Sequence, residues 1–379
     1  MEINTVAFLT SAHSPFDDRI FYHQAKSVSK RFKVVVVSST ENVKKTVGNI
    51  SIIGDNRYSS DKKKKIEFFN QTLIQFNPEI IVCSEPLPIF AAIKYKKKAH
   101  LDVKIIYDVT EWYPSKKNLD GLPFLKRILS FFSLLSFNLY TSSHCDGFIF
   151  GEYYKSLPFR FLFQRKKWAI ISYFPDLKYI NHQKSMLIPG RICLGYTGNI
   201  SIEKGIKSFF DVATIVKTRN PDVAVKLKII GSCISDKEKE IFEKLCRAAV
   251  DIDIELLERQ NFEQFSDELV GIDILFDLRK VDFENNHCLA IKVFYYAACG
   301  KPVIYSDIKA IRREIDVNQF GHFVNPDHSE KIADYVTEYM KNPDLYVKHS
   351  QAARKLAETN YNWGIIEPLF LDFIYMFQT

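Results

Sequence analysis

The sequence predicts an α/β protein made of two tandem Rossmann-like domains. Short apolar runs alternate with segments whose apolar residues recur at helical spacing, which is typical of parallel sheets covered by helices on both faces. This alternation starts again in the second half, after a polar stretch at 175–190. The length of 379 residues is that of two ordinary domains.

In the first half, each apolar run predicts a buried strand, and a periodic segment between two runs predicts a crossover helix. Ligands of such sheets lie beyond the carboxyl ends of the strands, and polar side chains gather there after the runs that end near 11, 84 and 109. The expected strands are 5–11, 33–39, 50–54, 79–84, 103–109, 147–153 and 168–174, and the expected helices are 19–31, 61–76 and 87–99.

One helical segment, 122–140, is apolar and aromatic on almost every side. We expect it to be a buried helix of the first domain. The alternative is a helix that lies in a membrane interface. The segment 156–168 favours this alternative, because it interleaves basic and aromatic residues as interfacial segments do.

The second half begins with an expected strand, 192–197, followed by a glycine-containing segment and a helix that reaches about residue 219. Gly198 allows a close backbone approach to a ligand, and Lys204 comes just before the helix. A glycine turn and a cation between a strand and a helix N-terminus can cradle a diphosphate. The remaining expected strands are 225–231, 252–257, 272–278 and 303–306, and the remaining helices are 237–250, 262–270, 308–315, 328–359 and 361–377.

The stretch from His287 to Val303 predicts a helix that opens polar, carries Lys292 and ends at Gly300. A cation near a helix N-terminus favours a phosphate-bearing ligand. The alternative is an ordinary crossover helix with a solvated lysine.

Charge and cysteine content narrow the class of protein. Residues 1–190 hold 28 Lys and Arg against 16 Asp and Glu, whereas the remainder holds 24 against 29. The basic first half favours an anionic partner, either a membrane surface or a pyrophosphate-linked substrate. The seven scattered cysteines form no CxxC pair, and we expect reduced thiols in a cytoplasmic protein. We expect no signal peptide and no membrane span.

Four segments resemble the family-4 glycosyltransferases of the GT-B fold, which are nucleotide-sugar-dependent, anomer-retaining enzymes. The resemblance runs over nearly the whole chain, and the segments come in the family's order. They are HSPFDDRIFYHQAKSVSKRFKVVVVS (13–38), YDVTEWYP (107–114), LGYTGNISIEKGI (194–206) and AIKVFYYAACGKPVIYSD (290–307).

The resemblance implies a GT-B architecture with a cleft between its two domains. Residues 1–180 would bind the acceptor, 181–362 would bind the nucleotide sugar, and 363–379 would be a helix that packs back toward the first domain. The implied reaction moves a sugar from a nucleotide-sugar donor, expected to be a UDP-sugar, to a saccharide or polyprenyl-pyrophosphate-linked acceptor in cell-surface polysaccharide synthesis. A peripheral position on the inner face of the plasma membrane is a further expectation.

The resemblance also assigns site residues, and no metal ion is expected. Asp108, Glu111 and His13 are the candidate catalytic groups, with Asp108 or Glu111 orienting the acceptor hydroxyl. Asp18 and Arg19 lie on the acceptor side, although they and Asp108 can also be purely structural residues that cap a helix or pair with each other. The candidate donor-binding residues are Gly198, Asn199, Lys204, Gly205, His287, Lys292 and Tyr295.

Four positions depart from the family's pattern. Asn199 stands where an arginine often follows the glycine, and Thr110 stands where a histidine often lies two positions after the aspartate. His287 and Tyr295 stand where the family usually has two glutamates eight positions apart. A tyrosine hydroxyl can still form a hydrogen bond but carries no charge. This leaves two further hypotheses, a non-catalytic partner subunit of an active enzyme and a sugar-nucleotide epimerase of similar architecture. A nucleic-acid partner is not expected, because the basic residues form no recognisable reading module.

Overall fold

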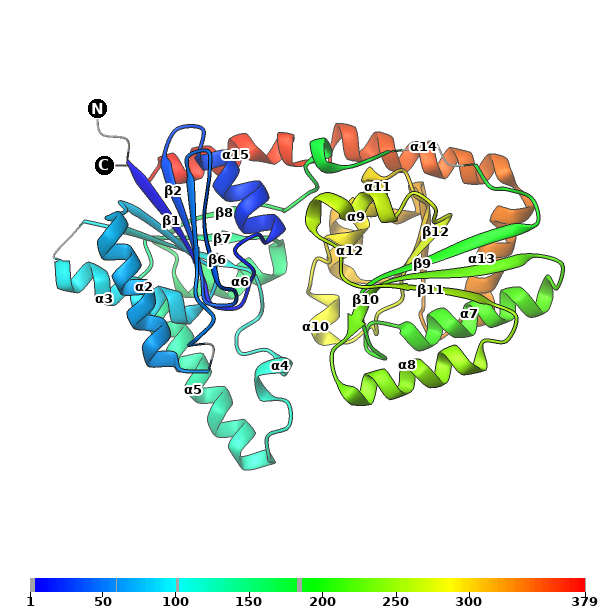
Figure 1. Ribbon diagram of the computed structural model, residues 1–379, viewed down its shortest axis with the longest axis horizontal. Helices are drawn as coiled ribbons and strands as arrows, with labels where there is room; N and C mark the ends of the chain where they lie inside the picture. The colour runs from blue at the N-terminus through cyan, green and yellow to red at the C-terminus, as the bar shows by residue number, and fades with distance from the viewer. Residues whose placement is uncertain (1–3, 59, 100–101, 183–185, 379) are drawn as a thin grey trace. The chain divides into compact units, whose positions relative to one another are not determined.

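The computed structural model describes residues 4–58, 60–99, 102–182 and 186–378. The chain divides into two compact units, and each contains one sheet flanked by helices (Figure 1). Unit 1 comprises residues 1–173 and 366–379, and unit 2 comprises residues 174–365. The sequence had placed these divisions after residues 180 and 362. The α/β fold class with two parallel-sheet units is as predicted.

The sheet of unit 1 has eight strands in the order β3-β4-β2-β1-β5-β6-β7-β8. All neighbours pair in parallel except β3 and β4, which form an antiparallel hairpin. The sequence analysis missed β3 because its middle residues are exposed and polar, so it has no apolar run. The strands are Thr5–Thr10 (β1), Lys33–Ser38 (β2), Val43–Val47 (β3), Ile50–Gly54 (β4), Ile80–Cys83 (β5), Lys104–Val109 (β6), Gly147–Phe150 (β7) and Lys167–Ile170 (β8).

The first crossover of unit 1 is a π-helix, η1, which continues into a short α-helix. Its N-terminus is capped by Asp17, whose carboxylate accepts the amides of Arg19 and Ile20. Asp61 caps α2 in the same way, so the lysines that follow it lie in the first turn. The helices are Asp18–Ala25 (η1), Lys26–Val28 (α1), Lys62–Phe76 (α2), Pro86–Ala99 (α3), Lys116–Leu119 (α4), Phe124–Ser143 (α5) and Tyr153–Leu162 (α6).

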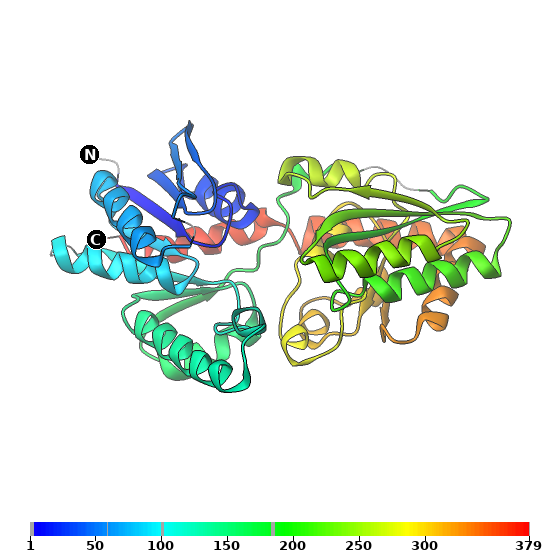
Figure 2. The same ribbon diagram turned by 60° about the horizontal axis from the view of Figure 1, so that its bottom comes forward.

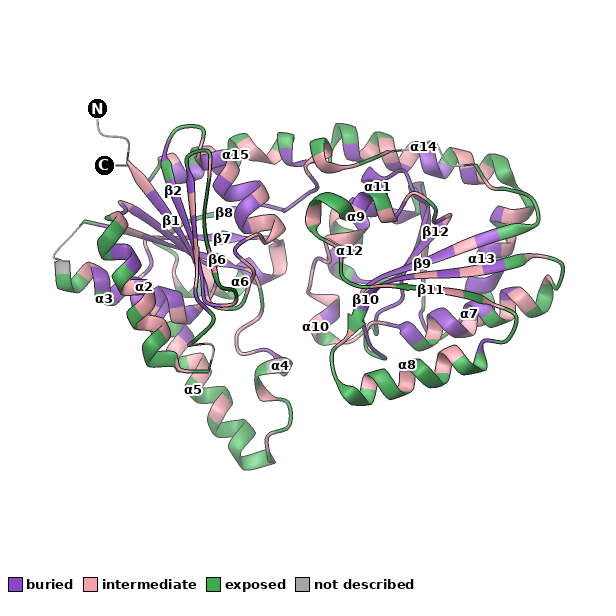
Figure 3. Ribbon diagram, viewed as in Figure 1, coloured by how far each residue is buried: buried purple, intermediate pink, exposed green. Residues whose placement is uncertain are grey.

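The expectation that the aromatic helix is buried was wrong. Helix α5 exposes eight large apolar side chains, and its first half extends past the strands of unit 1 (Figures 1 and 3). Leu125 and Leu129 are 73% and 71% exposed. The physical reason is length, because a 20-residue helix is about 30 Å long and outruns the short strands beside it.

The sheet of unit 2 has six parallel strands in the order β11-β10-β9-β12-β13-β14. The ladder between β9 and β10 continues to Ile200 and Cys233, so β9 runs three residues past the predicted end. The sequence analysis also missed β14, a short strand without a long apolar run. The strands are Arg191–Ile200 (β9), Ala224–Cys233 (β10), Asp253–Leu257 (β11), Ile274–Asp277 (β12), Val303–Ser306 (β13) and Gly321–Val324 (β14).

Helices α7 and α8 lie side by side on one face of the unit 2 sheet (Figures 1 and 2). The long helix expected at 328–359 is two helices, because Asn342 ends the first and caps the second, which starts at a proline. The helices are Leu177–Tyr179 (η2), Ile206–Arg219 (α7), Asp236–Ala248 (α8), Phe262–Glu268 (α9), Phe283–Asn286 (α10), Lys292–Ala298 (α11), Lys309–Glu314 (α12), Val317–Gln319 (η3), Ser329–Lys341 (α13) and Pro343–Thr359 (α14).

The last helix, α15, spans Trp363–Tyr375 and passes from unit 2 into unit 1. Its end packs on the unit 1 sheet, where a side chain at Gly147 would collide with the ring of Phe377. Tyr375 stacks on Phe32 at a centroid distance of 5.9 Å. Among the described residues, none of the helices is both long and apolar enough to span a membrane.

Candidate functional site

Each sheet has one point at which the strand order reverses. In unit 1 it lies between β1 and β5, and in unit 2 between β9 and β12. A crevice forms at the carboxyl edge of such a sheet, because the two neighbouring crossovers leave on opposite sides. Apart from Asp108 and Glu111 at the end of β6, the predicted site residues follow these strands in the sequence. Each unit therefore has one polar cluster to consider.

Lys292 is the centre of the cluster in unit 2. It is the first residue of α11, and its ammonium group donates a hydrogen bond to the carbonyl of Thr197 in β9. The same nitrogen lies 4.0 Å from the carboxylate of Asp277. Burial lowers the pKa of Lys292 to about 8, although Asp277 acts in the opposite direction. The structure thus holds a cation at the junction of β9 and β12.

The carboxylate beside this lysine was not among the residues predicted from the sequence. Asp277 ends β12 and is buried with Arg279, whose guanidinium donates to both carboxylate oxygens. Burial alone would raise the pKa of Asp277, but Arg279 and Lys292 lower it to about 2. An acidic residue that ends an apolar run, with an arginine two positions later, was the signal that could have revealed the pair. Because Arg279 neutralises Asp277, the charge of Lys292 is left for a ligand.

Lys204 approaches the same region from the turn before α7. Its ammonium group donates to the side-chain carbonyl of Asn285 at 3.1 Å and lies 3.3 Å from the carboxylate of Glu203. The Lys204 side chain is 30% exposed, whereas Asn285 is buried. Its charge is also among those that lower the pKa of Asp277. The turn that carries Lys204 also lies against the end of β12, because neighbouring Gly205 packs on Leu278, the residue after Asp277.

The two glycines near these lysines have separate roles. Gly198 has a φ of +99°, and a Cβ there would lie 2.5 Å from the ammonium nitrogen of Lys292. Gly205 has a φ of +85°, and its Cβ would collide with the carbonyl of Leu278, so it allows close packing after β9 and β12. Asn199 is exposed at the end of β9, and its carbonyl accepts from Tyr196. Of these three residues, Gly198 is the one that lies next to the ammonium group of Lys292.

The other two predicted donor residues are placed differently. His287 does not begin the helix that carries Lys292, because α11 begins at Lys292 itself; His287 ends α10, and its Nδ1 lies 2.7 Å from the carbonyl of Phe283. Tyr295 is buried in α11 and packs edge-on against Phe262 and Phe265 of α9. The aromatic ring therefore extends the packing between the two helices at a position where the family usually has a carboxylate.

In unit 1, His13 lies at the reversal point with two carboxylates. Its Nδ1 is 3.3 Å from Asp17 and its Nε2 is 3.4 Å from Glu85. Glu85 accepts the Ser11 amide and the Thr10 hydroxyl, and burial raises its pKa. Burial would lower the pKa of His13, but the hydrogen bond to Asp17 and both carboxylate charges raise it. The side chain of His13 remains 22% exposed, so a ligand can reach it.

Asp108 lies in a buried network rather than at the surface. It accepts hydrogen bonds from Gln24 at 2.8 Å and Tyr173 at 2.9 Å, and its carboxylate is 3.1 Å from the Nε of Arg19. Burial raises the pKa of Asp108 despite these partners. Both oxygens of Asp108 are occupied within the protein, and the carboxylate orients Arg19.

The remaining predicted residues of unit 1 are Asp18 and Glu111. Asp18 accepts its neighbour's amide at the start of η1, and its carbonyl lies 2.7 Å from the Nδ1 of His23. Glu111 is exposed in the bend after β6. Within the described part of the chain, the buried terminal nitrogen Nη2 of Arg19 has no hydrogen-bond partner. An anionic ligand could accept from it.

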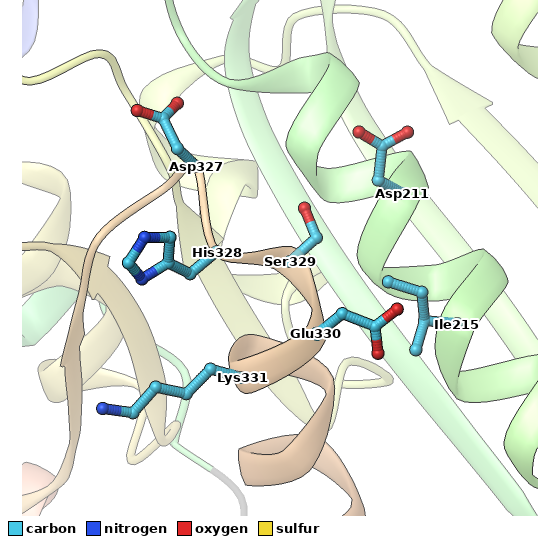
Figure 4. Close-up of a pocket in the computed structure, with 7 residues that line it drawn as sticks. All are labelled: Asp211, Ile215, Asp327, His328, Ser329, Glu330 and Lys331. Atoms are coloured by element: carbon cyan, nitrogen blue, oxygen red, sulfur yellow. The ribbon is translucent and has the colours of Figure 1, made fainter.

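A hollow of about 630 Å³ lies away from both clusters (Figure 4). It is bordered by α7 and the start of α13, and its lining carries the carboxylates of Asp211, Asp327 and Glu330. Glu330 is paired with Arg219. The lining of this hollow includes neither Lys204 nor Lys292, so we do not assign the donor site to it. Within the described residues, no three His, Cys, Asp or Glu side chains are grouped closely enough to hold a metal ion.

Comparison with known proteins agrees with the geometry. Residues 179–356 match the family described as glycosyl transferases group 1. A D-inositol 3-phosphate glycosyltransferase from Pseudarthrobacter chlorophenolicus is 23% identical over 184 residues, which are 48% of this chain and 42% of that protein. The matched region thus spans less than half the length of that relative.

Several solved structures share the fold over the full length. Sucrose-phosphate synthase from Thermosynechococcus elongatus is similar with a TM-score of 0.76 at 12% identity, covering 98% of both chains. HepE from Anabaena in complex with UDP-glucose has a TM-score of 0.69 at 11% identity, covering 98% of this chain and 99% of that one. A glycosyltransferase from Rickettsia africae has a TM-score of 0.68 at 12% identity, covering 100% and 99%. This likeness shows that the fold class is GT-B.

Proposed function

We propose that the chain is a retaining glycosyltransferase that uses a UDP-sugar, since residues 179–356 match the family described as glycosyl transferases group 1. The single observation that carries this proposal is the convergence of Lys204 and Lys292 at the reversal point of the unit 2 sheet. A GT-B neighbour, HepE, was crystallised with UDP and with UDP-glucose. Another, TarM, was crystallised with UDP.

In this proposal the diphosphate of the donor lies against Lys292 and Lys204. The absence of a side chain at Gly198 lets a phosphate approach the ammonium of Lys292. Negative charge develops on the departing UDP during transfer, and cations already in place stabilise it without reorganisation. Arg279 keeps Asp277 from cancelling their charge.

The acceptor is proposed to bind at the reversal point of unit 1. His13 is the accessible group there, with Asp17 and Glu85 fixing its two nitrogens. Arg19 offers a donor for an anionic group such as a phosphate. We propose a saccharide or polyprenyl-pyrophosphate-linked acceptor in cell-surface polysaccharide assembly, with the chain acting at the inner face of the plasma membrane. Asp108 then acts by positioning Arg19, and exposed Glu111 is a proposed contact to the acceptor.

The test of the donor site is UDP binding by thermal shift and calorimetry. Lys204→Ala and Lys292→Ala should each weaken UDP binding by about tenfold or more, because a hydrogen bond to a charged group contributes about 1.5–3 kcal/mol. Lys207→Ala is the matched control, since Lys207 is an exposed lysine of α7 that pairs with Asp211. Full UDP affinity in both site variants would refute the assignment.

We further propose that transfer requires no metal ion. Protein freed of divalent cations with a chelator should bind UDP and transfer sugar at the same rate as untreated protein. A loss of activity that returns on adding Mg²⁺ or Mn²⁺ would contradict this proposal. Binding, transfer and hydrolysis are measured in parallel in the same samples.

A second function is favoured by one observation. Tyr295 packs into the aromatic contacts with α9, and His287 closes α10, where the family usually has two glutamates. This arrangement suits a non-catalytic subunit that binds a nucleotide sugar for a partner enzyme. UDP-sugar binding without transfer, hydrolysis or isomerisation of the sugar would establish the second function in place of the first.

A further inference from the structure

Helix α5 has its apolar side turned away from its own unit. Phe124, Leu125, Ile128 and Phe132 recur at helical spacing, and all four are exposed, Phe124 by 74% and Phe132 by 60%. A helix on the surface of a globular protein normally turns such a stripe toward the core. Most of the first half of α5 has the colour of exposed residues in Figure 3, and the stripe is therefore available to an apolar partner.

The inward side of α5 is the more polar one. Asn138, Thr141 and Ser142 are its buried residues. Contact with α3 is made through Phe137, whose ring lies 5.7 Å from that of Phe90. Turning the apolar stripe inward would require the helix to rotate and give up these contacts. The outward orientation is thus built into how α5 attaches to unit 1.

The charges on α5 itself have one sign. Lys126 and Arg127 are exposed beside it, and the segment 122–143 contains no acidic residue. The exposed lysines 62–64 begin α2, which follows β4 just as α5 follows β6. Helix α2 leads from β4 to β5 and α5 leads from β6 to β7, so both advance in the same direction along the strand order. Because such crossovers are right-handed, both helices lie on the same face of the sheet and start at its carboxyl edge. This combination of apolar and basic side chains suits an anionic lipid surface.

The stripe lies at the functional edge of unit 1. A 20-residue helix is about 30 Å long, whereas the six-residue strand β6 spans about 20 Å. Since α5 ends at the amino edge, just before β7, its first turns pass beyond the carboxyl edge (Figure 1). His13 and Glu85 follow β1 and β5 at this carboxyl edge.

We infer that the first half of α5 inserts into the interfacial layer of an anionic lipid bilayer and brings the carboxyl edge of unit 1 to the membrane surface. The choice of a lipid-linked acceptor rests on the proposed function, whereas the docking itself rests on α5. Insertion buries the outward stripe among the acyl chains, while Lys126 and Arg127 meet the lipid phosphates.

The test is co-sedimentation of the whole chain with vesicles, either of phosphatidylcholine alone or mixed with an equal amount of phosphatidylglycerol. Leu125→Asn combined with Leu129→Asn should lower the partition coefficient by about tenfold or more on the mixed vesicles. Lys126→Gln combined with Arg127→Gln should lower it by about tenfold on mixed vesicles only. UDP binding should be unchanged in both variants.

The matched control is Ile74→Asn combined with Val250→Asn, which removes two aliphatic side chains that are 57% and 71% exposed elsewhere. Partitioning of this control should equal that of the unchanged protein. The inference fails if the unchanged protein does not sediment with mixed vesicles or if the control loses as much binding as the α5 variant. It also fails if the α5 aliphatic variant turns a lipid-free dimer into a monomer, because a second copy then covers α5. Absence of UDP binding would count against the proposed function alone.

Discussion

Replacing Lys292 by methionine should stabilise the folded chain at neutral pH while it weakens UDP binding. Burial lowers the pKa of Lys292 from 10.5 to about 8, which corresponds to about 3 kcal/mol of destabilisation for the charged amine at pH 7. Methionine has a similar length and removes this charge, but it gives up the hydrogen bond to Thr197, which is worth about 1 kcal/mol. The expected net gain is about 2 kcal/mol. Asp277 stays compensated through Arg279.

Thermal unfolding at two pH values checks the sign. Between pH 8 and 10.5 the unfolded chain binds more protons at this position than the folded chain, so the stability of the natural protein rises with pH over that range. The advantage of Lys292→Met should therefore be largest at pH 7, where unit 2 should melt about 4–8 °C higher, and should shrink at about pH 9.5. UDP affinity at pH 7 should fall by about tenfold or more.

The control is Lys207→Met, which changes an exposed lysine of α7 and should alter neither stability nor affinity by a measurable amount. A Lys292→Met variant that melts lower than the natural protein at both pH values would refute the claim that burial of the charge is destabilising. A variant with unchanged UDP affinity would refute the role of the ammonium group in binding the diphosphate.

Two further substitutions test the surroundings of this lysine. Gly198→Ala should abolish measurable UDP binding and lower the free energy of unfolding by about 1–3 kcal/mol, since φ is +99° and the new Cβ meets Lys292. Gly190→Ala is the control, because φ is +79° there and nothing lies within 4 Å of the new Cβ. It should show the backbone strain alone and keep UDP binding in calorimetry. Asp277→Asn should destabilise by about 3–5 kcal/mol in denaturant unfolding because it leaves a buried arginine without its partner, whereas Asp211→Asn, at an exposed pair, should change stability by less than about 0.5 kcal/mol. Equal effects at the two glycines, or at the two aspartates, would contradict these assignments.

The chain sequence by itself determined most of the strand and helix order. Buried parallel strands need continuous apolar runs, and helices need apolar residues at helical spacing. Both patterns were recognisable from the sequence alone. The strands β3 and β14 were not predicted, and both lie at the edge of their sheet. An edge strand pairs with its one neighbour through the backbone and needs no continuous apolar run. The sequence also placed Lys292 on a helix that stops at Gly300, but only the structure showed that this helix begins at Lys292 and not at His287.

Only the tertiary structure decided which charges act together and which side of a helix faces outward. The Asp277–Arg279 pair was invisible as a neighbour of Lys292 because its two residues are fifteen and thirteen positions away and meet it only through the pairing of β12 with β9. The sequence places Asp108 among the candidate catalytic residues, and only the structure showed that its carboxylate is buried and accepts from Gln24 and Tyr173 beside Arg19. The apolar helix α5 was expected to be buried, since composition specifies how much apolar surface a helix has. The length of the helix relative to its sheet determines how much of that surface can be covered.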